Sequence, residues 1–247
     1  MKKLIVAFLL ATVPLLGLAA GGGVHLDDAD IDLGDQASLQ RGAKYFMNYC
    51  LSCHSAKFQR YNRMAKDLGL TEDEVIQNLM FTTDKIGNTM DIAMTAEQGT
   101  EWFGSPPPDL SVISRARGVD WIYTYLRSFY LDEKLPFGVN NLVFPDVGMP
   151  HVLWELQGAQ KAVFKLEKKG SRGNDIQVFD HFEPVTQGTV SAEEYDQVAR
   201  DLTAFLSYVG EPIQMERKRL GVWVLLFIAV FFVMAYLLKK EYWKDVH

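Results

Sequence analysis

The chain has 247 residues, of which 48% are hydrophobic, 23% charged and 12% aromatic, and its formal net charge is −6. This length allows one or two domains with a sizeable core, and the composition excludes a disordered or fibrous protein. No nucleic-acid partner is expected for so acidic a chain.

The N-terminal segment has the features of a secretory signal peptide. Two lysines precede an uncharged apolar run over 4–18, and small residues follow the run. An uncleaved anchor is the alternative, but the run is short for a membrane span and Pro14 interrupts it. We therefore expect cleavage near Ala20 and export of the remainder of the chain.

The segment LQRGAKYFMNYC, residues 39–50, has the periodicity of a helix. Leu39, Ala43 and Phe46 fall on one face, with Tyr49 near its edge. A thioredoxin-type redox motif would follow a strand, so a helix before the cysteines argues against that chemistry.

The two cysteines of the chain, Cys50 and Cys53, lie three residues apart, and His54 follows directly. A zinc site would need further ligands at matched spacing, and the other histidines are scattered. The pattern C-x-x-C-H is instead typical of covalent haem attachment, in which the adjoining histidine binds the iron. We therefore predict one haem c, held through two thioethers, with His54 as an axial ligand.

The second axial ligand separates an electron carrier from a protein with an open iron site. Met149 is favoured because it lies in NNLVFPDVGMPHVLWE, where prolines and a glycine block regular helix. His151 is the rival ligand and would give a bis-histidine site of lower potential. Four other methionines lie in helix-like stretches where a core role is the default: Met64, Met80, Met90 and Met94. The last two remain minor ligand candidates.

Turn-forming residues mark three features in the C-terminal half. A short hairpin is expected near Val163–Phe179, an exposed loop at 171–174 in KKGSRGND, and a hinge at 210–212. The acidic clusters at 27–35, 72–74 and 193–196 are accounted for as solvated surface. An acidic exported face would also raise the encounter rate with a basic redox partner.

The run Leu220–Leu238 contains no charged residue. At about 1.5 Å per residue it matches the roughly 30 Å hydrocarbon core of a membrane. A buried core helix is the alternative, but tryptophan and tyrosine residues near both ends are typical of a membrane anchor. Cations flank the run equally on both sides, so the signal peptide decides its orientation.

The predicted organisation is a signal peptide over 1–20, a periplasmic haem c domain over 21–212, and an anchor with a short cytoplasmic tail over 213–247. The predicted fold class is mainly α, a cytochrome c-like haem domain with long loops plus one C-terminal transmembrane helix. The expected location is a membrane that the chain crosses once, and the resemblance described next implies the bacterial inner membrane.

These features together resemble the cytochrome c1 family, the haem c subunit of ubiquinol:cytochrome c reductase, known as the cytochrome bc1 complex. The resemblance is carried along nearly all of the mature chain by the segments RGAKYFMNYCLSCHS, PPPDLSVISRARGVDWIYTYLRSFY, GMP, EEYDQVARDLTAFLSYVGEP and the C-terminal anchor. It implies that Cys50 and Cys53 hold the haem, with His54 as the proximal ligand and Met149 as the distal one.

The resemblance also implies roles for the segment after the proline run. The turn at Pro108 would pack along the haem, and Arg117 would pair with a haem propionate, or Arg115 if the register differs by one turn. Two arginines on a solvated helix face are the alternative.

The sequence departs from the family pattern in three places. Residues 101–104 read EWFG where mitochondrial-type members carry an asparagine pair. Pro150, His151 and Val152 follow Met149, where the family often has Ala-Pro-Pro. No second cysteine pair exists for the extra disulfide of some bacterial members.

By resemblance, the chain would relay single electrons from the Rieske iron–sulfur protein to a soluble or membrane-bound cytochrome c, beside a cytochrome b subunit in a dimeric complex. It would need no catalytic acid, base or nucleophile of its own. One alternative is an anchored cytochrome c that donates to a terminal oxidase, although such proteins carry an N-terminal anchor. Another is an open-haem enzyme or sensor such as a peroxidase, but di-haem peroxidases need a second C-x-x-C-H.

Overall fold

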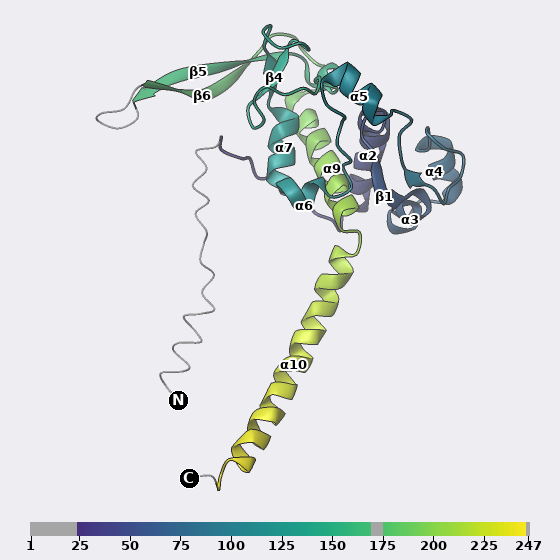
Figure 1. Cartoon of the computed structure of the whole chain (residues 1–247), viewed down its shortest axis with the longest axis vertical. Helices are drawn as coiled ribbons and strands as arrows, with labels where there is room; N and C mark the ends of the chain where they lie inside the picture. The colour runs from purple at the N-terminus through teal and green to yellow at the C-terminus, as the bar shows by residue number, and fades with distance from the viewer. Residues whose placement is uncertain (1–23, 169–174, 246–247) are drawn as a thin grey trace.

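The computed structural model describes residues 24–168 and 175–245 (Figure 1). The expected signal peptide and the loop expected at 171–174 lie outside these residues. The described part is mainly helical, with three small two-stranded antiparallel sheets and one long apolar helix at the C-terminal end, which confirms the predicted fold class.

The helices and strands follow one another in short elements joined by loops. The helices other than the two central ones are α3 (Tyr61–Asp67), α4 (Glu72–Asn78), α5 (Ala96–Phe103), α6 (Ile113–Arg117), α7 (Val119–Arg127), α8 (Trp154–Gln157) and α10 (Gln214–Tyr242). The strands pair as β1 (Ala56–Arg60) with β2 (Thr89–Met90), β3 (Phe129–Leu131) with β4 (Val139–Asn141), and β5 (Gln160–Lys168) with β6 (Asp175–Pro184).

Two helices form the centre of the domain: α2 (Gln36–Tyr45), which continues as one π-helical turn, η1 (Phe46–Cys50), and α9 (Ala192–Gly210). They approach closely at Gly42, where an added Cβ would clash with the carbonyl oxygen of Asp201. The expected apolar face before the cysteines is confirmed, because Leu39, Ala43 and Phe46 are buried in this core.

The Asp201 carboxylate fixes α9 to α2 from inside the core. It is 1% exposed and accepts hydrogen bonds from Ser38 Oγ at 2.6 Å, Arg41 Nε at 2.6 Å and Gln197 Nε2 at 2.8 Å. A buried carboxylate would be costly without such partners, so the four residues set how the two helices pack.

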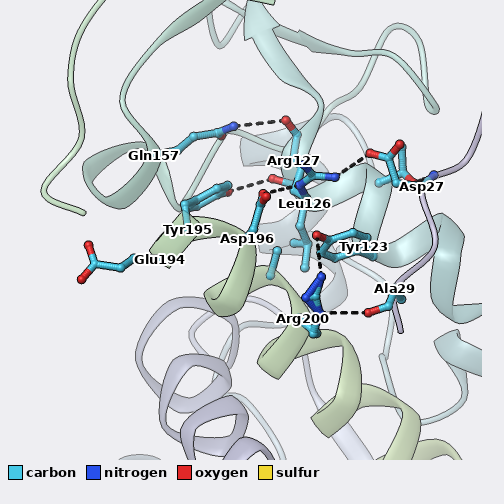
Figure 2. Close-up of polar contacts among 12 residues, drawn as sticks. Asp27, Ala29, Tyr123, Leu126, Arg127, Gln157, Glu194, Tyr195, Asp196 and Arg200 are labelled. Atoms are coloured by element: carbon cyan, nitrogen blue, oxygen red, sulfur yellow. Dashed lines mark hydrogen bonds and ion pairs between the residues drawn. The ribbon is translucent and has the colours of Figure 1, made fainter. Parts of the chain in front are cut away.

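The segment before α2, which contains Asp27 and Ala29, is fastened to α7 and α9 by polar contacts (Figure 2). Arg127 pairs with the carboxylates of Asp27 and Asp196, and Arg200 Nε donates to the carbonyl oxygen of Ala29 at 3.1 Å. Part of the acidic cluster at 27–35 is therefore engaged within the molecule.

The other two acidic clusters lie at helix N-termini. The Glu74 carboxylate accepts from the Thr71 backbone, and Glu194 does the same at Ser191, so both form capping boxes at the starts of α4 and α9. Negative charge in a first turn also interacts favourably with the helix dipole. These charges therefore have a local structural role.

The expected hairpin is confirmed as β5 and β6, which project from the domain (Figure 1). One face carries an aromatic series that starts at Tyr130 of β3 and continues through Phe164, Phe179 and Phe182. A lone hairpin is marginally stable in water, so this series supports it where it leaves the domain.

The helical expectation for three of the four methionines is wrong. Met64 lies in α3, but Met80 follows α4, Met90 lies in β2, and Met94 lies in the loop before α5. The segment between α4 and α5 is rich in Thr, Asp, Asn and Gly, which favour turns over a helix. The expected core role is confirmed for Met64, Met80 and Met90, which are buried.

The helical structure is interrupted between α9 and α10, at the position of the expected hinge. Ion pairs bridge this break, because the Glu211 carboxylate pairs with Arg217 of α10 and lies 3.1 Å from Arg115 Nη1 of α6. Among the described residues, α10 is the one helix long and apolar enough to cross a membrane, and it extends away from the domain (Figure 1).

Candidate functional site

The C-x-x-C-H motif forms the tight turn that ends η1. The carbonyl oxygen of Cys50 accepts from the backbone nitrogen of Cys53 at 3.1 Å and of His54 at 2.8 Å. Cys50 is buried, Cys53 is half-buried, and both are free thiols. Burial raises the pKa of the Cys50 thiol to about 12.

His54 is oriented by the proline turn. Its Nδ1 lies 2.8 Å from the carbonyl oxygen of Pro108, so the tautomer protonated at Nδ1 donates there and leaves Nε2 basic. Burial lowers the pKa of His54, and the hydrogen bond to Pro108 opposes this only in part. The neutral imidazole is therefore favoured, which is the form that binds metals.

The Asp109 carboxylate holds the proline turn against the motif. It accepts from Ser55 Oγ at 2.8 Å, from the Lys57 backbone nitrogen at 2.9 Å and from the Ser111 backbone nitrogen at 2.8 Å. Burial alone would raise the pKa of Asp109, but these hydrogen bonds outweigh burial and lower it. The segment after His54 and the turn that orients His54 are thus joined.

Replacing Asp109 by alanine is expected to lower the free energy of unfolding by about 1–3 kcal/mol, because three donors lose a charged acceptor. The orientation of His54 should loosen as well, which would broaden the spectrum of the bound haem. Thermal unfolding followed by haem absorbance measures the first effect. Asp91→Ala is the matched control, since that carboxylate is exposed and lies 3.6 Å from Lys57 Nζ. Equal midpoints for the two variants would contradict this role.

Met149 lies on a loop, as expected from its prolines and glycine. The loop is held from one side by Asn140, whose Oδ1 accepts from the backbone nitrogen of Asp146 at 2.9 Å. The half-buried Met149 sulfur accepts a hydrogen bond from the Tyr125 hydroxyl of α7, with 3.3 Å between the two atoms. The thioether therefore has a defined position.

His151, the rival ligand, is 9% exposed and stacks on Phe129, with ring centroids 4.7 Å apart and planes 7° apart. Burial lowers its pKa to about 4, and its Nε2 is a buried atom without a hydrogen-bond partner among the described residues. This nitrogen keeps His151 a chemically reasonable alternative to Met149.

The two arginines of the S-R-A-R segment have different surroundings. Arg115 is 60% exposed at its side chain and pairs with Glu211, which lies between α9 and α10. Arg117 lies over the Trp121 ring, 5.1 Å from its centroid, and over Phe144 at 5.8 Å. Because Trp121 in turn stacks on the tyrosine that contacts Met149, Arg117 is connected to Met149 through a series of aromatic contacts.

The residues fit a covalently attached haem. Two free thiols one turn apart, an imidazole with its Nδ1 engaged and a thioether on a fixed loop are the donor types that a six-coordinate c-type site requires. Sequence reasoning missed Asp109 and Tyr125. The only signals were an aspartate directly after the prolines and the spacing of four between Trp121 and Tyr125 on one helix.

Comparison with known proteins gives a consistent result. The profile of the Cytochrome C1 family matches residues 31–246. The chain is 55% identical to the cytochrome c1 of Allochromatium vinosum, over the full length of both. It is 47% identical to the ammonia monooxygenase gamma subunit of Nitrosomonas europaea, over 100% of this chain and 98% of that protein. It is 27% identical to a cytochrome b/c1 of Bradyrhizobium diazoefficiens, over 86% of this chain and 34% of that protein.

Proposed function

Because the chain belongs to the cytochrome c1 family, we propose that it takes single electrons from the Rieske iron–sulfur protein and passes them to a periplasmic cytochrome c. Members of this family are the haem c electron-transfer subunits of cytochrome bc1 complexes. The observation that carries this proposal is the full-length identity of 55% to a cytochrome c1. The C-x-x-C-H turn, with its oriented histidine, provides the matching chemistry.

In this proposal Cys50 and Cys53 bind the haem through thioethers, and His54 and Met149 are the axial ligands. The bound haem c supplies a one-electron couple. The contact between His54 and Pro108 supports a fixed imidazole, and a fixed imidazole keeps the reorganisation on electron transfer small. No other side chain of the chain needs to donate or accept a proton in such a relay.

We assign the propionate contact to Arg117 and a supporting role along the haem to Pro108. A guanidinium is well suited to pair with a carboxylate, and the aromatic faces of Trp121 and Phe144 hold this one in place. Arg115 is the weaker candidate, because its guanidinium already pairs with Glu211.

The proposed partners are the cytochrome b subunit, the Rieske protein and a soluble or membrane-bound cytochrome c, within a dimeric complex. The match to a relative named cytochrome b/c1 supports the first. We further propose that α10 anchors the chain once in the bacterial inner membrane, with the haem domain over 21–212 in the periplasm.

Isolation of the tagged chain from detergent-solubilised membranes tests the proposal. A b-type haem and an iron–sulfur protein are expected to copurify, and ubiquinol should reduce the haem c of the isolate. Membranes with the untagged chain are the control for unspecific recovery. Isolation of the chain alone, with a terminal oxidase or with monooxygenase subunits would overturn the proposal, and each result would identify a different alternative.

A further inference from the structure

The hydroxyl of Tyr125 is directed at the sulfur of Met149. The two atoms lie 3.3 Å apart, within hydrogen-bond range for a sulfur acceptor. A thioether is a weak acceptor compared with a carbonyl oxygen or water. This contact therefore does more than satisfy the hydrogen-bonding capacity of the Tyr125 hydroxyl.

The ring of Tyr125 is held on two sides. Trp121 stacks on it, with centroids 5.0 Å apart and planes at 11°, and Phe129 packs edge-on at 5.0 Å and 71°. The backbone carbonyl of Tyr125 also accepts from Asn141 Nδ2 at 2.8 Å. These contacts fix the direction of the hydroxyl without using it, so its hydrogen bond to Met149 does not depend on a mobile side chain.

A thioether sulfur has two lone pairs, so it can bind a metal through one and accept a hydrogen bond through the other. The hydrogen bond withdraws electron density from the sulfur. Ferric iron depends on that density more than ferrous iron does, so the hydrogen bond favours the reduced state. Partial burial strengthens the effect, because few water molecules compete for the hydroxyl.

We propose that Tyr125 is a positioning residue for the distal ligand: its hydroxyl holds the Met149 sulfur and raises the reduction potential of the bound haem. This inference rests on the proposed role of Met149. It adds a residue that contributes to the reduction potential of the haem in this subunit.

The Tyr125→Phe variant of the purified complex tests the inference, since it removes one oxygen and keeps the ring contacts. The loss of the hydrogen bond should shift the reduction equilibrium about two- to twelvefold toward ferric haem. At 59 mV per tenfold change for one electron, the midpoint potential should fall by about 20–60 mV. The far-red absorption band of thioether-bound ferric haem should persist.

Tyr123→Phe is the matched control. Tyr123 lies on the same helix, but its hydroxyl is 3.4 Å from Arg200 Nη2, among the contacts that fasten the segment before α2 (Figure 2). Its removal should leave the midpoint potential unchanged. Site-specific 3-fluorotyrosine at position 125, a stronger hydrogen-bond donor of nearly the same size, should shift the potential upward and provides a second arm should Tyr125→Phe not assemble.

The outcomes separate the inference from the proposed function. An unchanged potential in both position 125 variants, with the far-red band intact, would overturn the role of Tyr125 and leave Met149 as the ligand. Absence of the far-red band from the unsubstituted complex would reject Met149 itself, and the inference with it. Copurification with a b-type haem would be unaffected in either case.

Discussion

Replacement of His54 by alanine is expected to leave little mature haem-bearing protein. His54 ends the C-x-x-C-H turn, and its ring is the group that the carbonyl of Pro108 orients. In the proposed site the iron would then lack its proximal ligand, and the helix before the motif would lose a link to the rest of the domain. Haem staining of denatured protein and the absorbance of solubilised membranes measure the loss.

His181→Ala is the matched control for this experiment. Its imidazole lies on the projecting hairpin, pairs with Asp180 and is 52% exposed at the side chain, so the haem content should not change. Cys50→Ala should resemble His54→Ala, since it removes one of the two attachment points. Normal recovery of haem-stained protein from either variant would contradict the assignment of the motif.

Replacement of Gly42 by alanine is expected to destabilise the domain strongly. The new Cβ would clash with the carbonyl oxygen of Asp201 and lie 2.7 Å from Cβ of Phe205, so α2 and α9 would have to separate. Overpacking of this kind costs about 1–3 kcal/mol or more. Alanine otherwise favours a helix over glycine by about 1 kcal/mol, so a loss of stability would report the clash alone.

Thermal unfolding of the holoprotein in detergent measures this effect. Gly87→Ala is the matched control, because nothing lies within 4 Å of the Cβ it would add and its backbone is not in the left-handed region. A midpoint for Gly42→Ala at or above that of the control would mean that the two helices can move apart at little cost.

The features that could be predicted from sequence are those encoded locally. Helical periodicity identified the segment before Cys50, the uncharged run identified α10, and the prolines around Met149 indicated a loop. Each signal lies within a few residues of the feature it predicts, so no knowledge of the tertiary fold was required.

The features that could not be predicted depend on contacts between distant segments. Asp109 lies 54 positions from Ser55, and Tyr125 lies 24 positions from Met149. Nothing in the local pattern separates Arg115 from Arg117, and only the packing of α6 against the C-terminal end of α9 brings Arg115 to Glu211. Similarly, Met90 has no local strand signal, because β2 has two residues and exists through its pairing with β1.

The packing of α2 on α9 also bears on the order of events during biosynthesis. Ser38 contacts Asp201 across 163 positions, and Arg200 reaches Ala29 across 171. In the proposed export of the chain, N-terminus first, the cysteines would emerge before α9, the helix that packs on α2, has been synthesised. Closure of so long a loop is late and slow. Until α9 packs on α2, the thiols would thus stay accessible for haem attachment.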